Sequence, residues 1–142
     1  MMRLNIFFLL ITFFCQSQSD DIVGIWLEEE KQSKIEIYKK NNRFFGKIIW
    51  LKEPLDENGK IKLDKENPNS SLRNEPINGL VIMKNLKYIK KGEWSNGEIY
   101  DARSGKTYSL EVYMNNPNKL DLRGYLGFTL FGKTTSWTRV KN

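Results

Sequence analysis

Residues 34–51 read KIEIYKKNNRFFGKIIWL, and this stretch decides the fold. Ile35 and Ile37 fall on one face of an extended chain and their neighbours are polar or amphipathic, which is typical of a half-buried strand. The Asn41-Asn42 pair then predicts a tight turn, because asparagine tolerates the left-handed backbone that short hairpins require. Residues 44–51 are apolar on both faces. The stretch therefore predicts an antiparallel hairpin whose second strand lies inside a sheet.

Short strands of the same kind recur along the rest of the chain. We expect them at residues 22–28, 34–40, 44–51, 80–83, 98–101, 107–114, 119–125 and 134–140. Residues 52–78 carry three prolines and an Asn-Gly pair, which predicts one long loop. We find no amphipathic helix longer than two turns. About seven to nine short strands with little helix predict a sandwich or a barrel.

Two motifs near the chain ends favour the barrel. Gly24 and Trp26 lie on the first expected strand, and Trp137 and Arg139 lie on the last. These strands are neighbours in a closed up-and-down barrel, because closure removes both sheet edges. Arg139 would then cover the face of Trp26, a contact worth about 0.5–2 kcal/mol, and the four residues would plug one end. This pattern resembles the lipocalins; alternatively, both tryptophans only fill a core and Arg139 is on the surface.

Composition excludes several classes of protein. The 142 residues suffice for one ordinary domain, and they include no histidine and a single cysteine, Cys15. Ser-His-Asp and Cys-His catalysis, histidine or cysteine zinc sites and a disulfide within one chain are therefore excluded. We expect no metal and no cofactor. The remaining possibilities are carboxylate, lysine, tyrosine, serine or arginine chemistry, or a protein without chemistry of its own.

The first residues predict export. A positive charge precedes an apolar run, residues 4–14, that is too short to span a bilayer as a helix and ends in small polar residues. We expect a signal peptide at 1–19 and a barrel domain at 20–142, located in the periplasm or outside the cell. The alternative is a lipoprotein that is cut before Cys15 and acylated there. Phe14 disfavours it, because that cut needs a small residue before the cysteine.

Three local patterns suggest ligands, and the context argues against the first two. Residues 127–134, GFTLFGKT, match the written phosphate-loop pattern, but strand-forming residues follow where a helix is required, so we expect no nucleotide. Residues 56–59, DENG, are read as a turn, because the spaced carboxylates of a calcium loop do not continue. Residues 84–91 carry four lysines and could contact anionic lipid head groups, although such a run is usually a solvated face. Nucleic acid is not expected in this compartment.

A series of motifs in fixed order covers about residues 22–140. They are Gly24–Trp26, Gly46–Trp50, Asp64, Asn67–Asn69, Arg73, Gly79–Leu80, Trp94, Gly97–Asp101, Ser104–Tyr108, Arg123–Gly127 and Trp137–Arg139. This order resembles the bacterial domain-of-unknown-function family numbered 2147, a group of small exported proteins. Ala102 stands where the family pattern usually has proline. The resemblance implies a lipocalin-like barrel in the bacterial envelope, and it implies no activity and no catalytic residue.

Aromatic and charged residues of the C-terminal half form the candidate ligand-binding set. They are Trp94, Tyr100, Asp101, Arg103, Lys106, Tyr108, Arg123 and Tyr125. If their strands are adjacent, an open barrel mouth would offer rings that stack on the apolar part of a ligand and cations that hold its charge. An anionic amphiphile or a sugar would suit such a mouth. The structural alternative is that Asp101 caps the turn at Ser104-Gly105 and pairs with Arg123.

Three functions stay open at this point. We favour a non-enzymatic binder of a small amphiphilic or anionic molecule, which includes lipid-like ligands. The second is a hydrolase of envelope polysaccharide, in which Asp64 and Asp101 would have to face one cleft about 5–10 Å apart. The third is a module that docks another envelope protein through a sheet surface. In the long loop, Asp64, Asn67 and Arg73 either cover the mouth as a lid or only brace the loop backbone.

Overall fold

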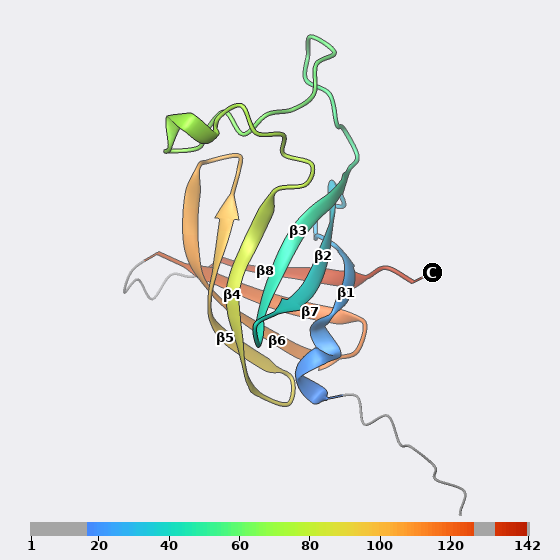
Figure 1. Ribbon diagram of the computed structural model, residues 1–142. Helices are drawn as coiled ribbons and strands as arrows, with labels where there is room; N and C mark the ends of the chain where they lie inside the picture. Colours follow the sequence, from blue (N-terminus) through green and yellow to red (C-terminus); the bar gives the residue numbers. More distant parts are fainter. Residues whose placement is uncertain (1–16, 127–132, 142) are drawn as a thin grey trace, which may run out of the picture.

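The structure, a computed structural model, describes residues 17–126 and 133–141. Within these ranges eight antiparallel strands follow one another around a closed barrel in sequence order (Figure 1). The strands are β1 (Gly24–Leu27), β2 (Ser33–Lys40), β3 (Arg43–Leu51), β4 (Val81–Lys90), β5 (Glu93–Asp101), β6 (Lys106–Asn116), β7 (Lys119–Tyr125) and β8 (Lys133–Arg139). This confirms the predicted all-β, up-and-down antiparallel barrel.

The first and last strands close the barrel. Trp26 on β1 pairs with Arg139 on β8, and Leu27 pairs with Thr138. The Val140 backbone N–H continues the seam by donating to the Ile25 carbonyl at 2.8 Å. The contact between the two chain ends therefore removes the free edges that an open sheet would expose.

Strands β4 and β5 are longer than the sequence predicts. Irregularities in both strands interrupt the side-chain alternation from which the prediction was made. Asn85 and Asn96 adopt left-handed backbone angles, with φ of 57° and 59°, and the pairing register shifts beside each of them. An extra residue of this kind is a β-bulge and interrupts the alternation of side chains. The basic residues 84–91, where no strand is expected beyond residue 83, therefore belong mostly to a strand.

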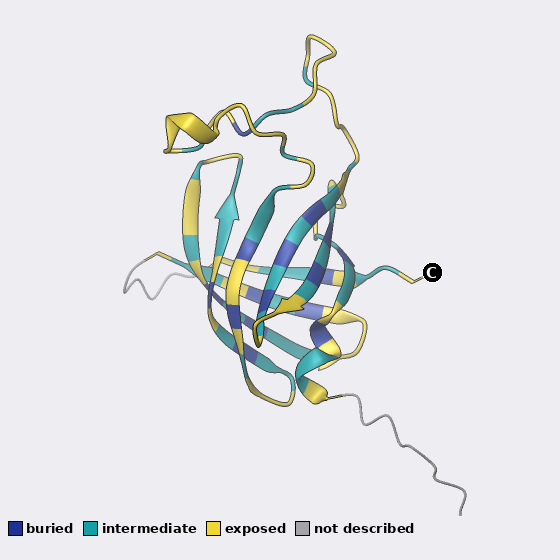
Figure 2. Ribbon diagram, viewed as in Figure 1, coloured by how far each residue is buried: buried dark blue, intermediate teal, exposed yellow. Residues whose placement is uncertain are grey.

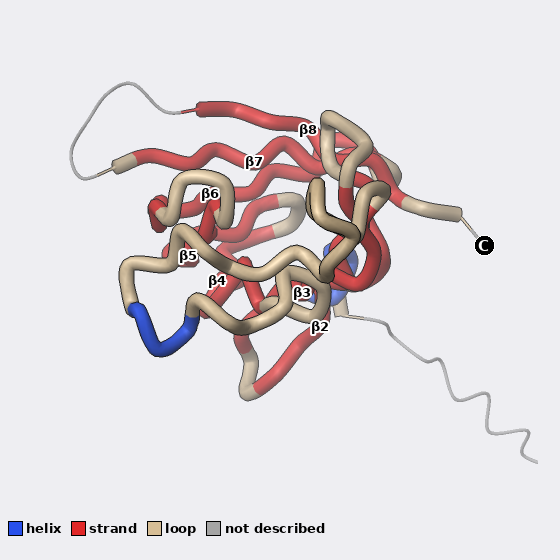
Figure 3. The backbone as a smooth tube through the Cα atoms, turned by 90° about the horizontal axis from the view of Figure 1, so that it is seen from above, coloured by secondary structure: helices blue, strands red, loops and turns tan. Residues whose placement is uncertain are grey.

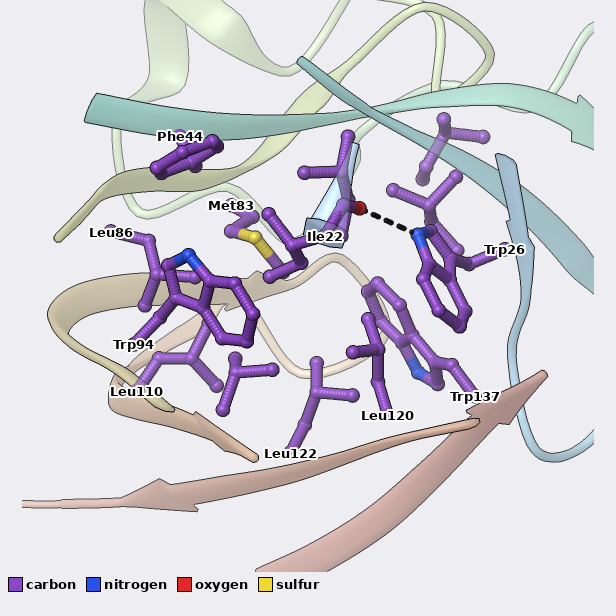
Figure 4. Packing of buried hydrophobic residues seen from close by; sticks show 14 residues of the cluster. Ile22, Trp26, Phe44, Met83, Leu86, Trp94, Leu110, Leu120, Leu122 and Trp137 are labelled. Atoms are coloured by element: carbon purple, nitrogen blue, oxygen red, sulfur yellow. Dashed lines mark hydrogen bonds between the residues drawn. The ribbon is translucent and has the colours of Figure 1, made fainter. Parts of the chain in front are cut away.

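Inward-facing apolar side chains fill one end of the barrel, which we call the closed end. The buried apolar residues are Ile22, Trp26, Ile35, Ile37, Phe44, Ile48, Met83, Leu86, Trp94, Leu110, Val112, Leu120, Leu122 and Trp137. Figure 2 shows buried positions alternating along the strands, and Figure 4 shows Trp94 beside Leu86, and Trp26 and Trp137 on the other side of the cluster. Each large side chain contributes about 1.5–3 kcal/mol when fully buried.

A short 3-10 helix, η1 (Gln18–Ile22), covers the closed end. Its Ile22 carbonyl accepts a hydrogen bond from Trp26 Nε1 at 2.9 Å, drawn as a dashed line in Figure 4. Its Ser19 carbonyl accepts a second one from Trp94 Nε1 at 3.2 Å. Both indole N–H groups are thereby satisfied inside the core. The expected processing boundary after residue 19 falls within this helix.

The opposite end, which we call the mouth, carries the long loop between β3 and β4 (Figures 1 and 3). Two isolated bridges, Leu55 with Ile61 and Leu63 with Pro76, give the loop internal structure. A single turn of 3-10 helix, η2 (Ser70–Leu72), lies within the segment that the second bridge closes. The predicted loop at 52–78 is thus present as an ordered excursion at one end of the barrel.

Within the described residues, the strands and the buried apolar cluster of the barrel lie between residues 18 and 139. In the described part of the chain, no helix has the length and apolar character needed to cross a membrane. The phosphate-loop pattern at 127–134 lies outside the described residues except for Lys133 and Thr134, which begin β8.

Candidate ligand-binding site

A cavity of about 480 Å³ opens at the mouth of the barrel. Its walls are inward-facing side chains of β2 to β8, and its rim is formed by the β1–β2 turn, the β5–β6 turn and the long loop. The apolar and aromatic residues of its wall are Ile35, Ile48, Leu51, Ile77, Ile82, Ile99, Tyr100, Tyr108, Leu110, Leu122 and Trp137. The volume falls in the range of small-molecule sites.

The rim carries more carboxyl groups than cations. Its acidic residues are Glu28, Glu29, Glu30, Glu53 and Asp101, and its basic residues are Lys62, Arg103 and Lys133. The chain as a whole has a net charge of +6. The rim of the mouth therefore carries an excess of acidic side chains on a protein that is basic overall. This differs from the expected mouth, in which cations outnumbered a single carboxylate.

Ion pairs tie the rim together. The Arg103 guanidinium lies 3.0 Å from Glu30 Oε2 and 3.3 Å from Asp101 Oδ1. The first contact joins the β1–β2 turn to the β5–β6 turn. Lys62 Nζ lies 4.0 Å from Glu53 Oε2 within the long loop. Two of the three rim cations are therefore already engaged by rim carboxyl groups.

Asp64 anchors the long loop to the barrel. Its side chain is fully buried, at 0% exposure. It accepts a hydrogen bond from the Tyr100 hydroxyl at 2.7 Å and another from Asn67 Nδ2 at 2.8 Å. Arg73 Nε donates to the Asn67 carbonyl at 2.7 Å. Burial, together with the hydrogen bond to Asp64, raises the pKa of Tyr100 to about 12. The three loop residues thus brace the loop and hold it beside the cavity.

The buried position of Asp64 bears on the hydrolase hypothesis. Asp101 lines the cavity but Asp64 does not, and both Asp64 oxygens already accept hydrogen bonds. Asp101 in turn accepts from the Arg103 backbone N–H at 3.0 Å and from the Ser104 hydroxyl at 3.2 Å, which is the turn-capping role considered above. The structure therefore does not place Asp64 and Asp101 together in one cleft, as the hydrolase hypothesis requires.

Three residues of the predicted ligand-binding set lie in the cavity, and Arg103 joins them at the rim. Tyr100, Asp101 and Tyr108 line it. Trp94 does not: it is on the same strand as Tyr100 but six residues earlier, about 20 Å away at the rise of an extended chain, and it is buried at the closed end. Lys106 is exposed beside Asp101 and is not part of the lining.

Arg123 and Tyr125 lie on the outer wall, so their expected place in the mouth is wrong. Residues of a strand alternate between its faces, and in β7 the buried Leu122 faces inward, which turns Arg123 outward. The Tyr125 hydroxyl donates to Glu111 Oε1 at 3.3 Å, and the Tyr113 hydroxyl donates to Glu111 Oε2 at 3.0 Å. The hydrogen bond to Glu111, followed by burial, raises the pKa of Tyr113.

At the closed end the structure brings Gly24, Trp26 and Arg139 together. The Arg139 guanidinium lies 4.2 Å from the centre of the Trp26 ring. It donates to three backbone carbonyls, those of Val23 at 2.9 Å, Asp21 at 2.6 Å and Pro117 at 2.8 Å. A Cβ on Gly24 would lie 2.6 Å from Arg139 Nη1, so only glycine leaves room for the guanidinium. Trp137 lies deeper and also lines the floor of the cavity.

The acidic part of the rim was missed by sequence reasoning. Residues 28–30 form a run of three glutamates directly after the first strand. In an up-and-down barrel every second turn lies at the same end, so the turn after β1 shares the mouth with the long loop and the turn after β5. The three glutamates are visible in the sequence, but the end of the barrel at which they lie follows only from the barrel topology. Among the described residues no group of three or more acidic, histidine or cysteine side chains is arranged to hold a metal ion.

An eight-stranded closed barrel with one sealed end and one open cavity defines the class: a lipocalin-like β-barrel protein. The chain belongs to the bacterial family described as "Uncharacterized protein conserved in bacteria (DUF2147)", which matches residues 24–139. It is also similar to a solved structure described as "Protein HP1028 from the human pathogen Helicobacter pylori belongs to the lipocalin family". The TM-score is 0.72 and the identity 30%, over 84% of this chain and 83% of the other. No curated protein matches the chain.

Proposed function

We propose that this protein is a non-enzymatic binder that holds one small amphiphile in the barrel mouth. The observation that carries the proposal is the cavity of about 480 Å³, apolar along its walls and charged at its rim. An apolar tail inside the cavity would gain a favourable free energy of about 25 cal/mol for each Å² of apolar surface removed from water. A polar head would stay at the rim. On the evidence of residues 1–19, we further propose that the protein is exported to the bacterial envelope.

The rim favours a head group that is uncharged or cationic. Five carboxyl groups and three cations surround the opening, and Arg103 is held by both Glu30 and Asp101. An anionic head would have to approach this excess of carboxyl groups and compete for the engaged guanidinium. Sugars and hydroxyl-bearing heads would find donors and acceptors in Gln32, Ser33 and Thr135, which also line the opening.

The test is ligand binding by residues 17–142, purified without detergent. Native mass spectrometry would show any molecule that is carried through purification. N-phenylnaphthylamine, a neutral amphiphile whose fluorescence rises in apolar surroundings, would report the cavity directly. Dodecyl compounds with uncharged, cationic and anionic heads would then compete with it. We expect saturable binding and the weakest competition from the anionic head.

A variant that fills the cavity separates this site from other apolar surfaces. Ile99→Trp places a larger side chain in the wall, and Ile49→Trp makes the same change at a residue of β3 that does not line the cavity. We expect the first to weaken binding by at least about tenfold, or about 1.4 kcal/mol, and the second to leave it within about twofold. Equal effects of the two substitutions, or no saturable binding by the unaltered protein, would contradict the proposal.

A further inference from the structure

Two turns at the closed end place cations side by side. Lys40 and Arg43 flank the β2–β3 turn and are paired with each other across it. The next residue, Phe44, pairs with Leu86 on β4, which brings Arg43 next to Lys87. Both turns lie at the lower edge of the barrel in Figure 1, and both are largely exposed in Figure 2.

The β4–β5 turn extends this positive surface. Lys90 and Lys91 are exposed at its tip. Together with the neighbouring cations they form a patch that we call the basic end: Lys40, Arg43, Lys87, Lys90 and Lys91. Glu93 lies beside it, 3.5 Å from Lys90, and Asp20 pairs at 2.9 Å with Lys39, the residue before Lys40. Within the described part of the chain, the other four cations form no ion pair.

An apolar side chain stands among these cations. Ile89 is 45% exposed, whereas its neighbour Tyr88 turns inward and packs edge-on against Trp94 at 5.9 Å between ring centres. An exposed aliphatic group next to several lysines favours contact with anionic lipid, because the cations meet phosphate groups and the apolar group enters the head-group layer.

We propose that the basic end docks the barrel on an anionic phospholipid bilayer, with the mouth pointing away from the lipid. The charge of the patch is complementary to such a surface, and the cavity lies at the opposite end, where it stays open to solvent. The docking surface shares no residue with the cavity lining. This inference is therefore independent of the function proposed above.

The experiment is vesicle co-sedimentation of residues 17–142. One set of vesicles contains phosphatidylglycerol and phosphatidylcholine, and the other contains phosphatidylcholine alone. We expect binding to the anionic vesicles only, and a loss of binding as salt is raised. Because each cation near the surface contributes about fivefold to partitioning, Lys87→Glu with Lys91→Glu should weaken binding by at least about 25-fold.

A matched variant controls for net charge. Lys52→Glu with Lys60→Glu changes the net charge equally but on the long loop at the mouth, and we expect it to weaken binding by less than about threefold. Far-ultraviolet circular dichroism of both variants reports that the barrel is intact. The proposal is overturned if the unaltered protein ignores anionic vesicles, if it binds both vesicle types alike, or if the two variants lose binding equally.

Discussion

The contact of Arg139 with Gly24 and Trp26, which we call the seal, closes one end of the barrel. It predicts a large loss of stability from one substitution, Arg139→Met. Methionine keeps an unbranched apolar stem over the Trp26 ring but removes the charge and all donors. The guanidinium makes three hydrogen bonds to backbone carbonyls, between 2.6 and 2.9 Å, and lies 4.2 Å from the ring centre. At about 0.5–1.5 kcal/mol net per hydrogen bond and about 0.5–2 kcal/mol for the ring contact, we expect the free energy of unfolding to fall by about 3 kcal/mol.

Urea unfolding followed by far-ultraviolet circular dichroism measures this loss. The slope of the free energy with urea should stay unchanged, because the barrel exposes the same surface when it unfolds. Arg123→Met is the matched control: Arg123 is exposed on the outer wall, and its loss should change stability by no more than about 0.5 kcal/mol.

A second substitution tests whether the seal acts as a unit. A Cβ at position 24 would lie 2.6 Å from Arg139 Nη1, and Gly24 has a φ of +145°. Gly24→Ala should therefore displace the guanidinium and lose much of the same free energy. The double variant should lose clearly less than the sum, since both changes break one set of contacts. A loss below about 1 kcal/mol in Arg139→Met, or strict additivity of the two changes, would refute this reasoning.

Three further predictions concern stability. Removing every residue before Asp20 takes away the Ser19 carbonyl, which accepts a hydrogen bond from Trp94 Nε1. Compared with a protein that begins three residues earlier, the urea midpoint should fall by the equivalent of about 1 kcal/mol. Equal midpoints would argue against this contact. Tyr100 should titrate near pH 12 by ultraviolet absorbance. Because this pKa lies above the unfolded value of 10.0, the associated stability is fully present below pH 10 and is lost as pH rises through 12; a transition near 10 in the folded protein would contradict it. Gly97→Ala places a Cβ 2.8 Å from a leucine side chain of β4 and should cost about 1–3 kcal/mol by overpacking, which a thermal melt would detect.

The fold was largely predictable, because its signals are local. The alternation in residues 34–40 and the Asn41-Asn42 turn are properties of neighbouring residues, and the structure forms this hairpin as expected. The strand limits around Asn85 and Asn96 were not predictable from alternation, since a bulge shifts the pattern without leaving a strong local mark. The paired chain ends were predictable only once closure was assumed.

The candidate site was predicted only in part. Leu122 and Arg123 are adjacent on one strand, so they cannot both face the cavity, and this parity was readable in the sequence. The distance between Trp94 and Tyr100 along β5 was readable as well. The engagement of Arg103 by Glu30 was not, because it joins turns 73 residues apart in the chain.

The amino-acid sequence by itself determined that this chain builds a sheet from short strands, with turns and a long loop at defined places and without histidine or disulfide chemistry. Those properties follow from residue types and their spacing over a few positions. Only the tertiary structure decided which end stays open, which charges surround that opening and which carboxyl group is buried. These depend on how distant strands curve and pair, and a side chain acquires its neighbours only when that curvature is complete.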